Sequence, residues 1–370
     1  MRAHYDSVEL RYGCTDEMYG PDVRKYQGVP TLAITKGGRM FLGWCSGGNA
    51  EPRIENFDIL HYSDDFGKTF KKTPVVVIDS DREKLIHAFD LQLWVDPDGA
   101  LHVVWVQEDA RPKRPDENPK WTPENPIATG EGYVFDDFEH ASWEIVCKDP
   151  DADELVFSEP RRAFSGFLRC KPLVTKSGKI FAFAYDQLTD RYTYNVSCDG
   201  GKTWSREMGG KKVLTPFDEG MAYQLEDGTI RMLARCEGGE LAETYSYDDG
   251  ESWTDGKLSG IVSPSSRFYV SRTPTGRLLL ALNDAPVRRN MTVKLSEDDG
   301  KTWKYSLSID ERADVSYPEA DFYDGKIYLT YDRGRKTDNE ILLVTLTEDD
   351  IINGVRPEIK IVSKPGYTEV

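Results

Sequence analysis

One eight-residue pattern occurs four times in the chain and limits what the chain can fold into. It reads Ser-x-Asp-x-Gly-x-Thr-Trp with small variations, and the copies are SDDFGKTF from Ser63, SCDGGKTW from Ser197, SYDDGESW from Ser246 and SEDDGKTW from Ser296. Ser and Asp side chains bond nearby backbone groups and Gly supplies a positive φ, so each copy predicts a tight hairpin turn. The last three copies recur every ~50 residues, which is typical of β-propeller blades with four short strands.

A second marker gives an independent count of the blades. Six short turns each precede an apolar strand, and their glycines are Gly38, Gly99, Gly178, Gly228, Gly276 and Gly325. Together the two markers predict an all-β, six-bladed propeller that fills residues 1–370 as a single domain. The Gly turn is expected between strands one and two of each blade, and the octet between strands three and four. The expected blades span residues 26–78, 84–160, 164–212, 216–258, 262–309 and 312–352.

The segments that do not fit the repeat are expected to be loops or to close the ring. Blade two has lost its octet, and blade six keeps only a remnant around Thr345 to Asp350. Residues 108–133, rich in proline and charge, predict a long loop between strands two and three of blade two. Ring closure is assigned to one of two terminal segments, SVELRY at 7–12, through pairing with the last blade, or EIKIVS at 358–363.

Composition narrows the classes of function. The chain carries 64 acidic and 47 basic residues, a net charge of −17, which argues against non-specific nucleic-acid binding and against an anionic membrane surface. The N-terminal residues lack the apolar run of a signal peptide, so a cytoplasmic protein is expected, with a secreted chain that has been trimmed as the alternative. The six cysteines and the histidines lack metal-ligand spacing, which predicts free thiols and no metal or organic cofactor.

Strand order predicts that polar side chains gather at one mouth of the central funnel. The Gly turns and octets lie on the far face, so the near face receives the starts of the first strands and the ends of the second. A Glu, a Tyr and several Arg at one mouth predict a site for an anionic small molecule. Counting about nine residues back and seven forward from the Gly turns gives Asp90, Arg169, Tyr185, Glu219, Arg235, Arg267, Asn283, Tyr317 and Asp332.

The same segments resemble the sialidase (neuraminidase) superfamily over essentially the whole chain. The octets resemble its Asp boxes, and DEGMAYQLEDGTIRMLAR resembles the segment with an activating Glu and a carboxylate-binding Arg, here Glu219 and Arg235. VSYPEADFYDGKIYLTYDRG resembles the segment with the Tyr nucleophile, here Tyr317, and VRRNMTVKLSEDDGKTW resembles the one that supplies a further Arg, here Arg288 or Arg289. The resemblance implies an exo-glycosidase that acts with retention on a terminal sialic acid or related acidic sugar.

The start of blade one departs from the family pattern. Sialidases have Arg-Ile-Pro there, whereas this chain has Gly28, Val29 and Pro30, so the first arginine of the carboxylate-binding triad is absent. Gln27 and Arg53 are the expected substitutes. Losing a charged, bidentate contact costs about 1.5–3 kcal/mol of recognition, so the preferred substrate is expected to differ from an ordinary sialic acid.

The proton donor also departs from the pattern. Sialidases use an Asp on the blade-one loop, whereas this loop offers Glu51, Glu55 and Asp58, of which Glu55 is preferred over Glu51. Asp90 is assigned either to catalysis or to bonding backbone groups at the start of its strand. Further substrate-binding assignments at the mouth are Arg267, Lys171 and Asn283.

Two other classes of function fit the same scaffold, because a fold does not fix a function. One is a polysaccharide lyase, in which Tyr317 would act as a base on a uronic acid, or another glycosidase acting on uronic acid- or rhamnose-containing glycans. The other is a carbohydrate-binding propeller without catalysis, which the missing arginine leaves open. All readings imply a carbohydrate partner, and the sequence makes no prediction of oligomeric state.

Overall fold

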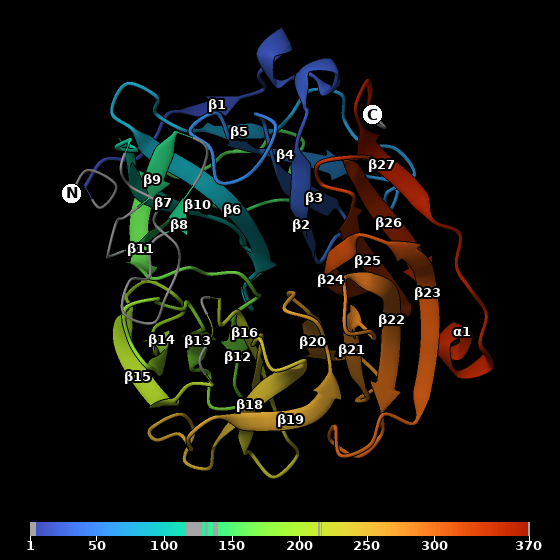
Figure 1. The fold of residues 1–370 in the computed structure, drawn as a ribbon. Coiled ribbons are helices and arrows are strands. Elements are labelled where there is room, and N and C mark those ends of the chain that lie inside the picture. Colours follow the sequence, from blue (N-terminus) through green and yellow to red (C-terminus); the bar gives the residue numbers. More distant parts are fainter. Residues whose placement is uncertain are drawn as a thin grey trace.

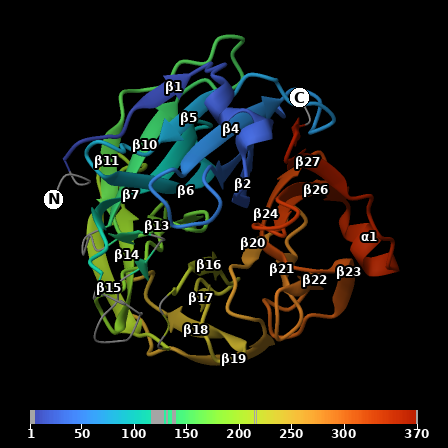
Figure 2. The same cartoon turned by 45° about the horizontal axis from the view of Figure 1, so that its top comes forward.

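The structure, a computed structural model, describes residues 5–115, 128–129, 132–135, 140–213, 215 and 217–368. Within these residues, six antiparallel sheets stand around a central axis (Figure 1), and the tilted view shows them as a closed ring (Figure 2). The six-bladed, all-β propeller predicted from the two markers is therefore confirmed. None of the described helices is long and apolar enough to cross a membrane.

Each blade starts with its innermost strand. Blade one contains β2 (Gln27–Ile34), β3 (Met40–Ser46), β4 (Phe57–Ser63), β5 (Val76–Asp79) and the added outer strand β1 (Leu10–Tyr12). Blade two contains β6 (Ile86–Val95), β7 (Leu101–Pro112), β10 (Ala141–Cys147) and β11 (Arg161–Ser165), with the short β8 (Ala128–Thr129) and β9 (Tyr133–Phe135) at the end of β7. Blade three contains β12 (Leu173–Val174), β13 (Ile180–Ala182), β14 (Arg191–Ser197) and β15 (Ser205–Lys211).

The other three blades repeat this order. Blade four contains β16 (Gly220–Gln224), β17 (Ile230–Ala234), β18 (Glu240–Ser246) and β19 (Lys257–Val262). Blade five contains β20 (Tyr269–Arg272), β21 (Leu278–Asn283), β22 (Arg289–Ser296) and β23 (Tyr305–Ala313). Blade six contains β24 (Val315–Tyr323), β25 (Lys326–Arg333), β26 (Glu340–Leu346), β27 (Lys360–Lys364) and β28 (Tyr367–Thr368). The helical elements are η1 (Glu17–Tyr19), η2 (Pro21–Val23) and α1 (Glu348–Asn353).

The four octets form the turns between third and fourth strands, as expected. In the copy at Ser296, the Ser hydroxyl accepts a hydrogen bond from the Gly300 amide at 2.8 Å and donates one to Asp298 at 2.8 Å. Asp298 in turn accepts from the amide and hydroxyl of Thr302 at 2.8 and 2.7 Å. The same contacts recur in the other three copies, so each turn satisfies its own polar groups.

Replacing Gly300 in such a turn should destabilise the fold without touching activity. Its φ is +76°, and a Cβ there would lie 2.6 Å from the Tyr223 hydroxyl. We expect Gly300→Ala to lower the free energy of unfolding by about 2–4 kcal/mol, from backbone strain and overpacking together. Gly228→Ala is the matched control, because Gly228 has a φ of +93° but no atom within 4 Å of the added Cβ. If Tm fell equally in the two variants, a steric clash with Tyr223 would not explain the loss of stability.

The chain termini do not exchange strands between the first and last blades. Residues of the SVELRY segment form β1, which pairs with β5 of blade one and not with the last blade. EIKIVS contributes to β27, the outer strand of blade six, where it pairs with β26. In blade six the octet remnant does not form a hairpin. It starts the helix α1, which Thr347 and Asp350 cap, so the outer strand of this blade comes from the later segment β27. The ring closes where β2 packs against β24 (Figure 1).

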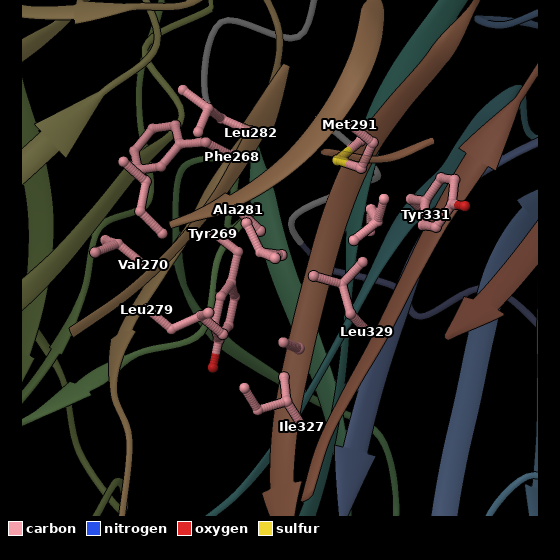
Figure 3. Close-up of a cluster of buried hydrophobic side chains, with 14 of the residues drawn as sticks. Phe268, Tyr269, Val270, Leu279, Ala281, Leu282, Met291, Ile327, Leu329 and Tyr331 are labelled. Carbon is pink, nitrogen blue, oxygen red and sulfur yellow. The ribbon is translucent and has the colours of Figure 1, made fainter. Parts of the chain in front are cut away.

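The hydrophobic core lies between neighbouring blades. Figure 3 shows its largest cluster, in which side chains from blade five, such as Leu279 and Met291, face side chains from blade six, such as Leu329. Every second residue of a strand points to the same face of its sheet. Apolar residues at these positions therefore form the contacts between neighbouring blades. Packing between blades fixes the inner strands, whose starts carry the candidate site.

Three inner strands share a bulge near their starts. Val29, Asp90 and Tyr317 have φ values of +58°, +63° and +55°, and the pairing register of each strand shifts at that point. A bulge changes the direction of a side chain and strains the local backbone. Strained residues of this kind are common at functional sites. In blades two and six the bulged residues, Asp90 and Tyr317, line the cavity at the near mouth of the funnel.

Candidate active site

A cavity of about 240 Å³ lies at the near mouth of the funnel. It receives the starts of inner strands, the ends of second strands and the loop between β3 and β4, as strand order predicted. A larger hollow of about 610 Å³ lies at the other end of the inner strands and carries no Tyr and Glu in hydrogen-bonding contact. The charged and polar residues of the near cavity are Glu51, Asp90, Glu108, Arg169, Tyr185, Gln187, Glu219, Arg235, Arg288, Tyr317 and Arg335.

Tyr317, Glu219 and Arg235 form one hydrogen-bonded group. The Tyr317 hydroxyl donates to Glu219 Oε1 at 3.2 Å and accepts from Arg235 Nη1 at 2.9 Å. Arg235 also donates to Glu219 Oε2 at 3.2 Å, and its Nε is held by the Ser265 hydroxyl at 3.0 Å. The three side chains come from β24, from the residue before β16 and from the residue after β17, so three neighbouring strand ends build the group. A carboxylate and a guanidinium thus meet at one phenol oxygen.

Cations dominate the electrostatics of this group. Burial alone would raise the pKa of Glu219, but the guanidinium groups of Arg235, Arg169 and Arg267 outweigh burial and hold the pKa below its ordinary value. Burial likewise opposes the charge of Arg235, yet its nearness to Tyr317 and Glu219 raises its pKa. Glu219 is therefore ionised at neutral pH and is a proton acceptor in reach of the phenol.

Four further arginines surround the Tyr317 ring. The guanidinium carbon of Arg335 lies 3.9 Å from the ring centroid, and those of Arg288 and Arg267 lie at 5.2 Å. Arg169 lies at 5.6 Å and forms an ion pair with Asp90, the bulged residue of β6. Together with Arg235, which bonds the hydroxyl, these arginines make the surroundings of the Tyr317 ring cationic.

Arg267 supports the site from below and does not line the cavity. Its side chain is 1% exposed, and its guanidinium donates to the carbonyl oxygens of Arg169, Pro30 and Tyr317 at 3.0, 2.7 and 3.2 Å. These bonds tie Arg267 to the backbone of three other blades. The substrate-binding role expected for Arg267 is therefore corrected.

Glu51, and not Glu55, is the loop carboxylate at the cavity. Glu51 Oε1 lies 3.2 Å from Arg335 Nη1, and its second oxygen accepts from the Tyr26 hydroxyl. Glu55 is exposed and does not line the cavity, so the preference for Glu55 is corrected. The loop folds back on itself because the Asn56 amide donates to the carbonyl oxygens at Gly47 and Ala50, and this directs residue 51 inward.

A buried pair ties this loop to the cavity wall. His87 Nδ1 lies 2.8 Å from Glu108, which lines the cavity, and its Nε2 lies 3.3 Å from Asn56 Oδ1. Burial opposes the charge of Glu108, but hydrogen bonds from His140 and His87 lower its pKa. No sequence pattern marks Glu108, because it lies near the end of β7, past the position seven residues after Gly99 that the repeat predicts.

Arg335 is a cavity arginine that no sequence pattern marks. It follows β25 and donates to Asp332 at 2.8 Å, three residues before it. Its side chain passes directly over Gly28, where a Cβ would lie 2.8 Å from Arg335 Cδ. Counting seven residues forward from Gly325 reaches Asp332, near the end of β25. Arg335 lies in the loop after this strand, and the repeat does not predict the conformation of that loop.

The other expected substrate-binding residues lie outside the cavity. Gln27 is fully buried and bonds Trp44, Ser363 and the Asn339 carbonyl oxygen, and Asn283 bonds the carbonyl oxygens of Arg289 and Val315. Lys171 faces the opposite hollow, where it pairs with Asp321 at 2.8 Å. Arg289 is exposed on β22, while Arg288 reaches the cavity, and Arg53 is half-buried in the loop without lining the cavity. The substrate-binding roles expected for Gln27, Asn283, Lys171, Arg289 and Arg53 are corrected on this ground.

Asp58, the third acidic residue considered for the blade-one loop, does not line the cavity. Its burial predicts that the stability of the protein depends on pH. Asp58 is fully buried on β4, and burial raises its pKa to about 8 against the opposing effects of the Leu91 backbone, Arg169 and the Cys45 thiol. The native state therefore keeps a proton that the unfolded chain releases near pH 4, so this group lowers stability progressively as pH rises from about 4 to about 8.

Asp58→Asn removes this titration. The difference in Tm between variant and wild type should therefore move in favour of the variant between about pH 5 and about pH 8.5. Thermal melts at both pH values measure it, with the exposed Asp98→Asn as the control. A Tm difference that does not change with pH would show that Asp58 is not protonated in the native state.

Comparisons with known proteins agree with this architecture. A sequence profile of the BNR repeat-like domain matches residues 148–329. The anhydrosialidase of the leech Macrobdella decora is 25% identical over 227 residues, which cover 54% of this chain and 29% of the leech protein. The NanB sialidase of Streptococcus pneumoniae superposes with a TM-score of 0.66 at 16% identity, covering 94% of this chain and 71% of that one. This chain therefore has a propeller fold similar to that of sialidases, with a BNR repeat-like region over residues 148–329.

A further structural relative of this sialidase-like propeller matches along nearly its whole length. The intramolecular trans-sialidase of Ruminococcus gnavus superposes with a TM-score of 0.67 at 14% identity, covering 95% of this chain and 99% of that one. By contrast, the alignment spans less than a third of the leech protein.

Proposed function

We propose that this protein is an exo-acting glycosidase that removes a terminal sialic acid, or a related acidic sugar, with retention of anomeric configuration. The observation that carries the proposal is the buried contact of the Tyr317 hydroxyl with Glu219 at 3.2 Å, in a cavity lined by four arginines. The volume of about 240 Å³ is at the small end for ligand sites, which favours a single terminal sugar over a stretch of polysaccharide.

A tyrosine suits an acidic sugar because it is neutral before it reacts. A sialic acid carries a carboxylate on its anomeric carbon, and that charge would repel a carboxylate nucleophile. A phenol ordinarily titrates near pH 10, so it needs a base and a stabilised anion. Glu219 is the base, and Arg235, which donates to the phenol oxygen at 2.9 Å, stabilises the anion.

The reaction proceeds in two displacements. In the first, the Tyr317 oxygen bonds to the anomeric carbon and gives its proton to Glu219, while the aglycone oxygen leaves with a proton from Glu51. In the second, water gives a proton to Glu51 and its oxygen bonds to the anomeric carbon, while Tyr317 leaves and recovers its proton from Glu219. Two inversions give net retention, and every group returns to its starting protonation state.

Arg288 and Asp90 are suited to bind the sugar. Among the described residues, Arg288 forms no ion pair, unlike the other three arginines of the cavity, and its guanidinium bonds only the Ser265 carbonyl oxygen at 3.1 Å. It is therefore the guanidinium most ready to bind the sugar carboxylate. Asp90 Oδ1 is buried and has no hydrogen-bond partner among the residues that the structure describes, so it can accept a bond from a sugar hydroxyl.

Transfer to a hydroxyl of the same sugar is a second candidate for the final step. It is favoured by the relatives, of which one is an anhydrosialidase and another an intramolecular trans-sialidase. The covalent step through Tyr317 is unchanged, and only the attacking oxygen differs. Proton NMR of the reaction products separates the two, since hydrolysis gives a free sugar and intramolecular transfer gives an anhydro sugar.

Turnover of a panel of 4-methylumbelliferyl glycosides tests the proposal. We expect fluorescence from the sialoside, or from another α-ketoside with an anomeric carboxylate, and none from neutral sugars. Proton NMR should show the α-anomer as the first product of hydrolysis. Inactivity on every acidic glycoside, with binding retained, would indicate a carbohydrate-binding propeller. Ultraviolet absorbance from an unsaturated uronide would indicate a lyase.

A further inference from the structure

Gly28 and Arg335 compete for the same space. A Cβ on Gly28 would lie 2.8 Å from Arg335 Cδ and 2.9 Å from both Cγ and Nε, which is closer than real Cβ contacts. Gly28 does not have a left-handed φ, so nothing in its backbone calls for glycine. The absence of a side chain at position 28 is therefore explained by the room that Arg335 needs.

Arg335 is held in place before any ligand arrives. Its Nε donates to Asp332 Oδ2 at 2.8 Å, and that carboxylate is fixed by the Val29 amide at 2.7 Å and the Ser316 hydroxyl at 2.6 Å. Burial opposes the charge of Arg335, but Asp332 and Glu51 raise its pKa, so it stays a cation. A fixed guanidinium loses little conformational entropy when an anion binds.

Of the other donors of Arg335, Nη2 reaches the Ser316 hydroxyl at 3.5 Å and Nη1 reaches the cavity. Its guanidinium stacks on the Tyr317 ring at 3.9 Å, and its Nη1 contacts Glu51 at 3.2 Å. Glu51 is 30% exposed and can turn away from this contact, whereas Asp332 is fully buried. An incoming carboxylate can therefore replace Glu51 at Nη1 while Asp332 keeps Nε.

We propose that Arg335, admitted by Gly28, binds the carboxylate of the substrate in place of an arginine on blade one, and that this binding releases Glu51 from its ion pair. The inference rests on the proposed function and adds the residue that determines selectivity for an acidic sugar. The same displacement couples recognition to catalysis, because Glu51, once an anion has replaced it at Arg335, can take up a proton from water and then donate that proton to the leaving oxygen.

Calorimetry with a matched pair of ligands tests this role. The probes are the 2,3-dehydro derivative of sialic acid and its carboxamide, which differ only in charge. Wild type should prefer the acid, and Arg335→Gln should weaken binding of the acid by roughly 10- to 100-fold while leaving the carboxamide nearly unchanged. Gly28→Ala should act in the same direction, because its Cβ displaces Arg335. Arg333→Gln, a change on β25 outside the cavity, is the control.

Glu51→Gln supplies a second arm that does not depend on removing Arg335. It removes the anion that competes for Nη1, so binding of the acid probe should become several-fold tighter while turnover falls. Equal weakening of both probes in Arg335→Gln, or an unchanged preference for the acid, would overturn the inference while leaving the glycosidase proposal intact. Absence of binding and of turnover in wild type would overturn both.

Discussion

Tyr317→Phe is expected to lower kcat on an activated acidic glycoside by at least about 1,000-fold, because it removes the oxygen that forms the covalent intermediate. The ring remains, so its contacts with Arg335 and Arg288 persist and the fold should be kept. Glu219 and Arg235 stay bonded to each other at 3.2 Å in the absence of the hydroxyl. Steady-state kinetics and a thermal melt of the variant measure the two effects separately.

Tyr323→Phe is the matched control for this variant. Tyr323 ends the same strand, β24, at the opposite mouth of the funnel, so its hydroxyl is remote from the cavity. It should retain wild-type kcat. A Tyr317→Phe variant with kcat within tenfold of wild type would exclude Tyr317 as the nucleophile.

Glu219→Gln is expected to lower kcat by roughly 100- to 10,000-fold, since it removes the general base but keeps the shape of the side chain. The pKa of Glu219 lies below its ordinary value, so the wild-type base is ionised throughout the near-neutral range. The loss should therefore be nearly constant from about pH 5 to about pH 8. The pH profile of kcat for both enzymes checks this expectation.

The exposed Glu226→Gln, in the Gly turn of the same blade, controls for loss of one negative charge. It should leave kcat unchanged. A Glu219→Gln variant whose activity recovers fully at alkaline pH would show that hydroxide or another group can replace the base, and would contradict the assignment of Glu219.

The blade count could be predicted from the sequence because turn chemistry is local. Ser296, Asp298 and Gly300 satisfy one another within a few residues, so the octet keeps its form wherever it occurs. The closure of the ring could not be predicted in the same way. Whether residues 7–12 pair with the first or the last blade depends on packing between segments far apart in the chain, and no local pattern records that choice.

The central residues of the candidate site followed from strand position, and its outer residues did not. Glu219, Arg235 and Tyr317 lie at strand ends that are a regular number of residues from the Gly turns. The structure brings the three side chains into contact. Glu51 and Arg335 lie in loops, where the direction of each side chain depends on contacts made after folding. Gly28 carried the missing signal, since an unexplained glycine marks a close approach of another group.

The central claim, that Tyr317 forms a covalent bond to the sugar, is tested most directly by trapping. A 2,3-difluorinated sialosyl fluoride, which reacts quickly and is released slowly, should label the enzyme, and mass spectrometry of a tryptic digest should place the adduct on the peptide of residues 313–326. Fragmentation should assign the added mass to Tyr317 and not to Tyr323, and Tyr317→Phe should remain unlabelled. Turnover of the acidic glycoside without any adduct on Tyr317 would contradict the mechanism.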